Sequence, residues 1–191
     1  MKYTIDNGLI PGTVLKKKDF GGVTGIEFLD KIYFVSNGLM LSQIREISGV
    51  DGSTLQNWVK RGWLVNTINK RYSKEQLARI LIINMMRPSM MLERIDFILK
   101  YINGELADTS DDIIPESELY GYVCEIYDRF GQLEESEPEN LRMLIRKVAD
   151  EKYVEPYEGT RDRLCKALEV IIVAYFASCA GSLANELFDE L

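Results

Sequence analysis

The amino-acid sequence predicts a mainly α-helical protein. Apolar residues recur every three or four positions along most of the chain, and serine, glycine or proline stands at the ends of those stretches. Only one short stretch, residues 65–72, alternates as a strand would. The chain has 191 residues, of which 46% are apolar and 28% are charged, so it is long enough to bury one large core or two small ones.

Charge is distributed unevenly along the chain. The net charge is −7, but residues 41–103 carry ten Lys and Arg against five Asp and Glu. Residues 104–191 carry eight basic against twenty-one acidic residues. Such asymmetry indicates an anion-binding part joined to a different part, although the acidic residues could equally form a solvated helix surface. We therefore divide the chain into an N-terminal segment (1–39), a basic domain (40–103) and an acidic helical domain (104–191).

The first predicted helices lie on either side of residue 40. Helical spacing covers residues 26–35 and stops at Gly38. Ser42 is a suitable N-cap for the next helix, which ends at Gly49. A short helix between two such signals is expected here.

A second short helix follows after a tight turn. Asp51-Gly52 is a turn sequence, and Ser53 is a good N-cap for a helix over 54–61. One side of that helix is apolar at positions i, i+3 and i+4. We expect its tryptophan, together with a second one just beyond the helix, to lie in the core; the residues are Leu55, Trp58 and Val59, then Trp63.

The remaining elements are a small wing and further helices. Residues 65–72 are predicted to form a short β-wing, and Ser73 caps the helix after it. An acidic linker, 105–115, separates this part from the C-terminal half. The predicted helices from here on are 74–86, 90–102, 116–130, 139–152 and 160–190.

Two short helices joined by a tight turn, the second polar on its outer side, form the helix-turn-helix pattern. The amides of Gln56 and Asn57 match the donor and acceptor pattern of adenine edges, while Lys60 and Arg61 can reach phosphates or guanine. The positive charge of residues 41–103 supplies attraction to any phosphate backbone. We therefore expect a double-stranded DNA partner.

This region resembles the MerR-like winged helix-turn-helix domain. The resemblance covers about 63 residues and rests on several motifs in order: Leu41-Ser42-Gln43-Ile44, Gly49-Val50, Ser53-Thr54-Leu55, Trp58, Lys60-Arg61-Gly62-Trp63-Leu64, Lys70-Arg71-Tyr72-Ser73 and Leu77. The chain as a whole is similar to a bacterial family of uncharacterised proteins that join such a domain to an all-helical partner. That second similarity implies architecture and no biochemical activity.

The MerR-like resemblance implies a set of DNA-binding residues. The wing residues Arg71 and Tyr72 would contact the DNA backbone, and Trp58 would be the half-buried aromatic of the recognition helix. The sequence departs from the family pattern at Gln56, Asn57 and Val59, so a base preference does not transfer. The predicted DNA-binding set is Ser53, Thr54, Gln56, Asn57, Lys60, Arg61, Lys70, Arg71 and Tyr72.

The sequence argues against an enzyme. It contains no histidine, which removes the usual general base and the commonest metal ligand, and it contains no phosphate-binding or nucleophile motif. We expect no cofactor and no metal. The three separated cysteines and the absence of a signal-like start indicate a cytoplasmic protein. Cys165, near Arg161 and Arg163, is either a buried structural thiol or an oxidant sensor with a lowered pKa.

The predicted function is a transcriptional regulator that acts as a homodimer, because one recognition helix reads only a few base pairs. The strongly apolar last helix is the candidate dimer contact; its stretch 167–180 is too short to span a bilayer, so no membrane partner is expected. Two alternatives stay open. The helix-turn-helix could be a scaffold for a protein partner, or the chain could sense a small-molecule effector in a pocket among C-terminal aromatics such as Tyr120 and Tyr175.

Overall fold

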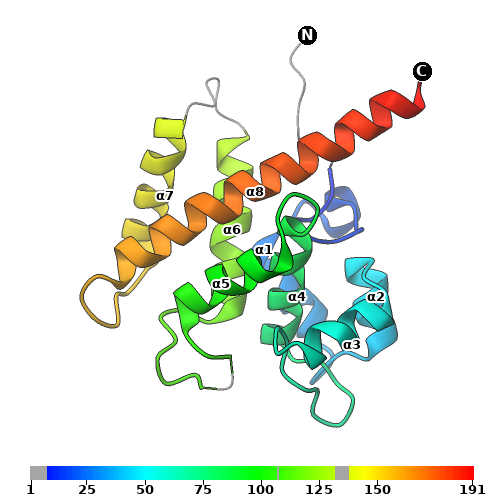
Figure 1. Cartoon of the computed structure of the whole chain (residues 1–191), viewed down its shortest axis with the longest axis horizontal. Coiled ribbons are helices and arrows are strands. Elements are labelled where there is room, and N and C mark those ends of the chain that lie inside the picture. The colour runs from blue at the N-terminus through cyan, green and yellow to red at the C-terminus, as the bar shows by residue number, and fades with distance from the viewer. Residues whose placement is uncertain (1–7, 107, 132–137) are drawn as a thin grey trace.

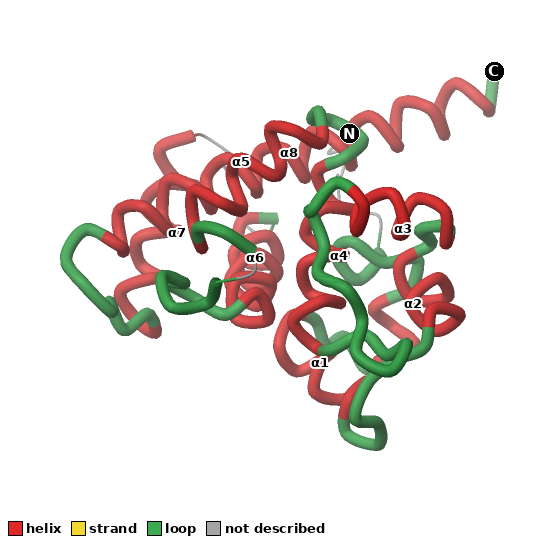
Figure 2. Tube along the Cα trace, turned by 60° about the horizontal axis from the view of Figure 1, so that its bottom comes forward, coloured by secondary structure: helices red, strands yellow, loops and turns green. Residues whose placement is uncertain are grey.

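The computed structural model describes residues 8–106, 108–131 and 138–191. The described residues form eight α-helices, one short 3-10 helix and no strands, so the mainly α-helical prediction is confirmed. Figure 2 shows helices joined by loops and no strand in this part of the chain. The helices are α1 (Gly25–Tyr33), α2 (Leu41–Ser48), α3 (Gly52–Lys60), α4 (Lys74–Met86), α5 (Leu92–Asn103), α6 (Glu116–Phe130), α7 (Pro138–Lys152) and α8 (Thr160–Asp189), with η1 at Lys17–Phe20.

Helix α4 is the centre of the molecule. It is apolar on almost every side, which is typical of a helix surrounded by others. It packs against α1, α2, α5, α6 and α8. Ser73 caps it as predicted: the Ser73 hydroxyl accepts from the backbone N–H of Gln76, and the Gln76 amide oxygen accepts from the N–H of Ser73. This helix therefore joins α1 and α2 to the C-terminal helices, and the buried apolar residues form one cluster through both parts.

The N-terminal segment is held against the C-terminal half by a close helix contact. Helix α1 packs on α6, and Gly25 and Gly121 lie at the crossing. A Cβ added to Gly121 would stand 2.7 Å from Cγ1 of Ile26. Only glycine at residue 121 permits this approach, so two segments almost 100 residues apart share one contact.

Helix α8 is the longest element. Its 30 residues span about 45 Å, and Figure 1 shows it crossing the front of the molecule and continuing past it. Its first two thirds pack against α4, α5, α6 and α7, whereas residues 180–191 are exposed apart from the half-buried Leu183. By length and composition alone α8 could span a membrane, and 44% of its most apolar 18-residue window is buried within the protein.

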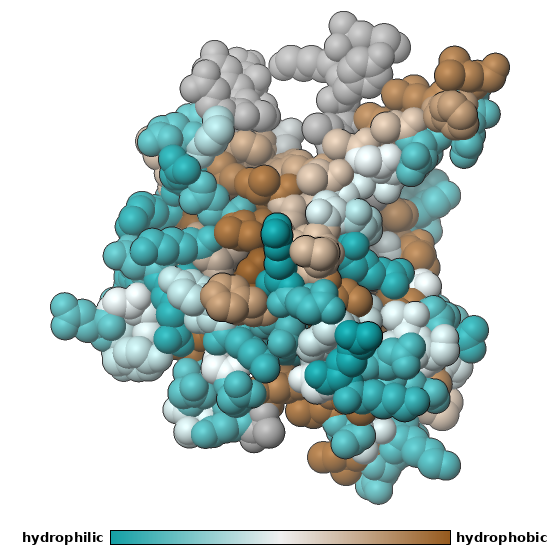
Figure 3. Space-filling model, viewed as in Figure 1, coloured by the Kyte–Doolittle hydropathy of each residue, from teal (hydrophilic) through white to brown (hydrophobic). Residues whose placement is uncertain are grey.

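The outer side of α8 carries an uninterrupted apolar row, which we call the outer stripe. Its members are exposed and are spaced alternately three and four residues apart, the spacing of a coiled-coil seam. Figure 3 shows apolar surface along this helix and at its exposed end. The outer stripe consists of Val170, Val173, Ala177, Ala180, Ala184, Leu187 and Leu191.

Candidate nucleic-acid interface

Helices α2 and α3 are two short helices joined by a tight turn at one end of the molecule, remote from α7 (Figure 1), and we call this pair the helix-turn-helix for its geometry alone. Gly49 ends α2 in the left-handed conformation, with φ 69°, and turns the chain toward α3. Leu55 and Trp58 are the buried residues of α3. Trp58 is 1% exposed and Trp63 is 8% exposed, so the prediction that both tryptophans lie in the core is confirmed.

The two predicted N-caps of this motif were wrong. Helix α2 starts at Leu41 with Met40 as its N-cap, because the Gln43 amide oxygen accepts from the Met40 N–H and Ser42 therefore lies within the helix. Helix α3 starts at Gly52 with Asp51 as its N-cap in place of Ser53. The predicted turn at Asp51-Gly52 is the beginning of the helix.

Asp51 determines the chemistry of the first turn of α3. Its carboxylate accepts from the backbone N–H of Thr54 at 2.9 Å, and from the hydroxyls of Ser53 and Thr54. These hydrogen bonds hold the pKa of Asp51 well below its usual range. The hydroxyls of Ser53 and Thr54, both predicted to contact DNA, therefore donate to Asp51. The first turn of α3 also carries the negative charge of Asp51, which the sequence analysis did not predict for the DNA-binding surface.

The middle of α3 presents polar side chains to solvent. Gln56, Asn57 and Lys60 are all exposed. Arg61 lies toward α5 instead: its guanidinium is 5.2 Å from the centre of the Trp63 ring, and Nη1 is 3.6 Å from Oε1 of Glu93. Of Gln56, Asn57, Lys60 and Arg61, the structure therefore leaves the first three exposed and partly neutralises the fourth.

The predicted β-wing is a single tight turn. Within the described residues no strand forms there; Ile68 and Arg71 make an isolated antiparallel bridge, with the Arg71 N–H donating to the Ile68 carbonyl at 2.9 Å. Asn69 and Lys70 both have positive φ, 51° and 59°, as in the two-residue hairpin turn whose twist matches that of strands. The stretch is too short for a longer ladder, since Tyr72 pairs with Leu39 instead.

The predicted wing contacts differ in accessibility. Tyr72 is 8% exposed and belongs to the core, and burial raises the pKa of its hydroxyl. Lys70 and Arg71 are exposed, and Ile68 at the turn is 80% exposed. Arg71 Nη1 donates to the Gly38 carbonyl at 2.9 Å, which fixes the side chain beside the loop before α2.

The exposed polar side chains of α3 and the turn form what we call the recognition face. Within residues 8–106, 108–131 and 138–191, no carboxylate lies within ion-pair distance of Lys60, Lys70 or Arg71. The described acidic residues of the C-terminal half thus leave these three cations unneutralised. The recognition face consists of Gln56, Asn57, Lys60, Lys70 and Arg71.

Sequence reasoning missed the buried arginine that supports this motif. Arg79 lies on α4 with a side chain only 5% exposed, and its Nε donates to the Trp63 carbonyl at 2.7 Å. Its Nη1 pairs with Glu116 at the start of α6. On α4 the neighbouring Gln76 donates to the carbonyl of Val65 at 3.0 Å. A charged residue within an otherwise apolar helix was the available signal.

The cysteines offer no reactive thiol. Cys124, Cys165 and Cys179 are all buried. Burial raises the pKa of Cys165, so the alternative of a lowered pKa near Arg161 is wrong. Among the described residues no group of three or more His, Cys, Asp or Glu could hold a metal ion.

The stretch of sequence that contains α2, α3 and the helices around them matches the model of a known family. A model of a domain of unknown function, DUF1836, matches residues 28–123, from α1 to α6, and the chain belongs to that family. The expectation of an uncharacterised family is thereby confirmed. The chain is 26% identical over 131 residues to the uncharacterized protein YkrK of Bacillus subtilis (strain 168), an alignment covering 60% of this chain and 56% of YkrK. It thus matches little more than half of that relative's length, and no solved structure matches it.

Proposed function

We propose that the protein is a DNA-binding transcriptional regulator in which α2 and α3 form a MerR-like helix-turn-helix and the turn 68–71 stands in the place of the wing. Helix α3 lies in a major groove, and the turn 68–71 contacts the adjacent backbone. The observation that carries the proposal is the recognition face: two exposed amides and three exposed cations that no described carboxylate neutralises. A short helix with a polar outer side and a basic rim suits the groove and its phosphates.

Residues of the recognition face divide by role. Gln56 and Asn57 stand on consecutive positions of α3 and offer paired donors and acceptors to base edges. Lys60, one turn further on, reaches a phosphate or a guanine, while Lys70 and Arg71 contact the backbone without reading sequence. The hydroxyls of Ser53 and Thr54 donate to Asp51, so they are not assigned a contact with DNA and only help to form the first turn of α3.

A second copy of the chain provides the second recognition helix. No described part of the chain covers the outer stripe along its seven positions, and helices of this spacing associate by burying the stripe. An isolated helix end as long as residues 180–191 is marginal in water, so pairing also stabilises it. Lys166 lies four residues before the first member of the stripe. In an antiparallel pair it comes near the acidic end of the other copy's helix, which is formed by Glu186, Asp189 and Glu190. We therefore propose a homodimer joined by antiparallel α8 helices.

Fluorescence anisotropy of the full chain with a labelled random duplex tests DNA binding. We expect binding at about 50 mM salt that weakens steeply as salt rises, with a log–log slope of several units. Lys60→Ala, Lys70→Ala and Arg71→Ala should each weaken binding by roughly three- to tenfold and reduce the slope by about one. Lys147→Ala, an exposed lysine on α7, is the control and should change nothing.

The same titration separates this proposal from its alternative. If the chain does not bind duplex DNA at low salt, or if Lys147→Ala weakens binding as much as Arg71→Ala, the recognition face does not bind DNA. The helix-turn-helix would then be a scaffold for a protein partner.

A further inference from the structure

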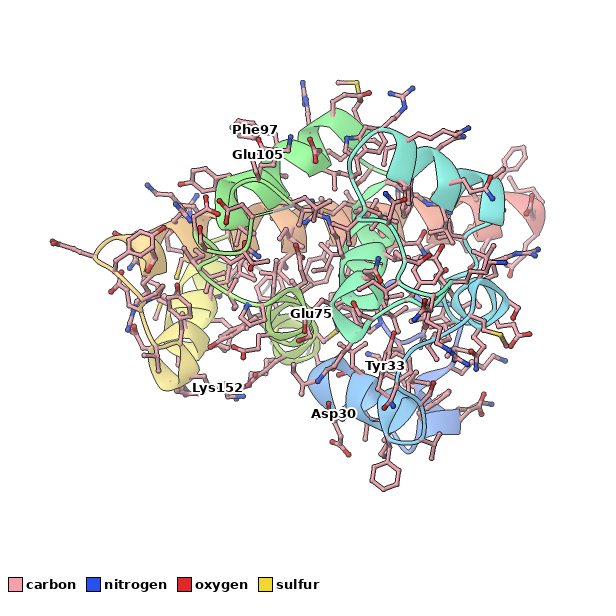
Figure 4. All side chains as sticks on the ribbon, turned by 90° about the horizontal axis from the view of Figure 1, so that it is seen from below. Asp30, Tyr33, Glu75, Phe97, Glu105 and Lys152 are labelled. Atoms are coloured by element: carbon pink, nitrogen blue, oxygen red, sulfur yellow. The ribbon has the colours of Figure 1, made fainter. Side chains whose placement is uncertain are left out.

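A cavity of about 780 Å³ lies where the helix-turn-helix meets the C-terminal helices. Its walls come from the start of α4, the start of α6, the loop before α6 and the residues that follow Trp63. Figure 4 shows Glu75, from the start of α4, lying between α4 and α6 at this junction. Its volume is within the range of small-molecule sites. We propose that this cavity binds a small organic cation, an amine or amidine with an apolar body, and that binding alters the affinity of the recognition face for DNA.

The charges that line the cavity select a cation. Three carboxylates line it, from Glu75, Asp112 and Glu116, against the single guanidinium of Arg79. Glu75 is already engaged, since its two oxygens accept from the N–H and hydroxyl of Ser117. Asp112 and Glu116 thus keep accepting capacity in the cavity wall.

Glu116 is the most incompletely satisfied of these groups. Its Oε1 pairs with Arg79, but its Oε2 is buried and has no hydrogen-bond donor among the described residues. Burial raises the pKa of both Glu116 and Asp112, because the positive charge around them does not fully offset their lost hydration. A bound cation would supply that charge.

An anion would find no comparable partner. Arg79 donates to the Trp63 carbonyl and to Glu116, and its Nη2 lies 4.0 Å from Oδ1 of Asp96. Its guanidinium is therefore surrounded by acceptors already. An anion would also face the carboxylate of Asp112.

The remaining wall is apolar and firmly held. Leu64, Ile113 and Ile114 contribute it. Asn103 holds Ile113 and Ile114 in place. Its Oδ1 accepts from the backbone N–H groups of both residues, and its Nδ2 donates to the Ile114 carbonyl at 2.7 Å. The Tyr153 hydroxyl donates to the Ile113 carbonyl at 3.1 Å. A ligand with a hydrocarbon body can pack on this surface while its charged end meets the carboxylates.

Arg79 connects the cavity to the proposed DNA-binding motif. It bonds Glu116 on one side and the Trp63 carbonyl on the other, directly after α3. Val65, which also lines the cavity, accepts from Gln76 and leads into the turn 68–71. A cation that competes with Arg79 for Glu116 would change the support of both α3 and the turn. This regulatory half of the inference rests on the proposed function; the binding half does not.

Three probes of one shape test the binding half: 2-phenylethylamine, 2-phenylethanol and phenylacetate, titrated into the ¹⁵N-labelled full chain and followed by amide chemical shifts. The amine should shift resonances of Val65, Gln76 and residues 113–117 and bind at least about tenfold more tightly than the alcohol. Equal binding of amine and alcohol, or tighter binding of phenylacetate, would overturn the assignment of a cation.

Variants locate the charge that the amine meets. Asp112→Asn and Glu116→Gln should each weaken amine binding by roughly fivefold or more, while Glu118→Gln, an exposed carboxylate on the same helix, should leave it unchanged. Circular dichroism of each variant establishes that it folds. If Glu118→Gln has the same effect as Glu116→Gln, the attraction is general and the cavity is not the site.

Anisotropy with duplex DNA tests the regulatory half. Saturating 2-phenylethylamine should change the DNA affinity at least threefold in the wild-type chain and leave it unchanged in Glu116→Gln. Amine binding without this change would refute regulation but leave the binding site. Absence of DNA binding with or without the amine would instead refute the proposed function, since the shift titration contains no DNA.

Discussion

The recognition face and the outer stripe are both exposed, yet their chemistry is opposite. The first gathers amides and cations from α3 and a tight turn, and no described carboxylate neutralises its cations. The second is a row of valine, alanine and leucine on one side of α8. Neither belongs to the buried core, which is complete without them. The proposed function accordingly assigns them partners of different kinds: a polyanion to the first and the apolar helix of a second copy to the second.

The largest effect is expected from breaking the connection between the two halves. Arg79→Ala leaves Glu116 buried without its cation and leaves Asp96 with Lys100 alone, so it should reduce the free energy of unfolding by about 3–5 kcal/mol. Urea titration followed by circular dichroism measures this. Arg94→Ala, at an exposed arginine on α5, should cost no more than about 0.5 kcal/mol.

A paired replacement makes that prediction specific. Arg79→Met combined with Glu116→Leu removes both charges, and it should recover most of the loss because no charge is then left unpaired on that side. Equal stability of Arg79→Ala and the wild type would show that the buried pair does not hold the halves together.

Next in size is the loss of the proposed dimer. Ala180→Glu with Leu187→Glu places like charges in the outer stripe and should raise the dimer dissociation constant by roughly 100-fold or more. Sedimentation velocity measures it. Asn185→Glu, on the same exposed helix end but outside the stripe, is the control. A wild-type chain that is monomeric at micromolar concentration would contradict the stripe as a dimer contact.

Sequence reading should depend mainly on the two amides of α3, Gln56 and Asn57. Gln56→Ala with Asn57→Ala should lower discrimination between a selected duplex and a random one by roughly 10- to 100-fold, while affinity for random DNA stays near its wild-type value. Competition anisotropy compares the two duplexes. Asn185→Ala should keep full discrimination, and a uniform loss of affinity in the double variant would argue against base contacts.

The smallest effect concerns the carboxylate at the start of α3. Asp51→Asn keeps an equally good N-cap but removes a negative charge beside the recognition face, so it should tighten random-duplex binding by roughly two- to fivefold. The melting temperature should change little. Weaker binding would mean that the Asp51 charge organises the first turn for DNA and does not oppose it.

Local signals in the sequence predicted the helices well. Ser73 gave the start of α4, and apolar spacing gave the bounds of α6 as they stand in the structure. N-caps were less predictable, because Asp51 and Ser53 are both good caps and only the folded chain decides between them. The wing prediction failed since alternation over a few residues does not reveal that Tyr72 pairs with Leu39, more than 30 residues earlier.

Tertiary features lay beyond the reach of the sequence pattern. The ion pair of Arg79 with Glu116 joins residues 37 positions apart, and no periodicity links them. The cavity beside this pair has part of its wall from the loop that Asn103 holds, and no local pattern reveals that these segments meet. Tyr120 and Tyr175, proposed from sequence as part of a pocket, are instead buried in the core.

The turn at Asn69-Lys70 is less stable than a glycine turn would be, but it places a positive charge at its tip. Lysine in the left-handed region costs roughly 1 kcal/mol relative to glycine, which fits such a turn freely. Lys70→Gly should therefore raise the melting temperature while it weakens DNA binding, whereas Asn69→Gly should raise the melting temperature slightly and leave DNA binding intact. The tip of this turn thus carries a cation in a conformation where glycine would give the more stable hairpin.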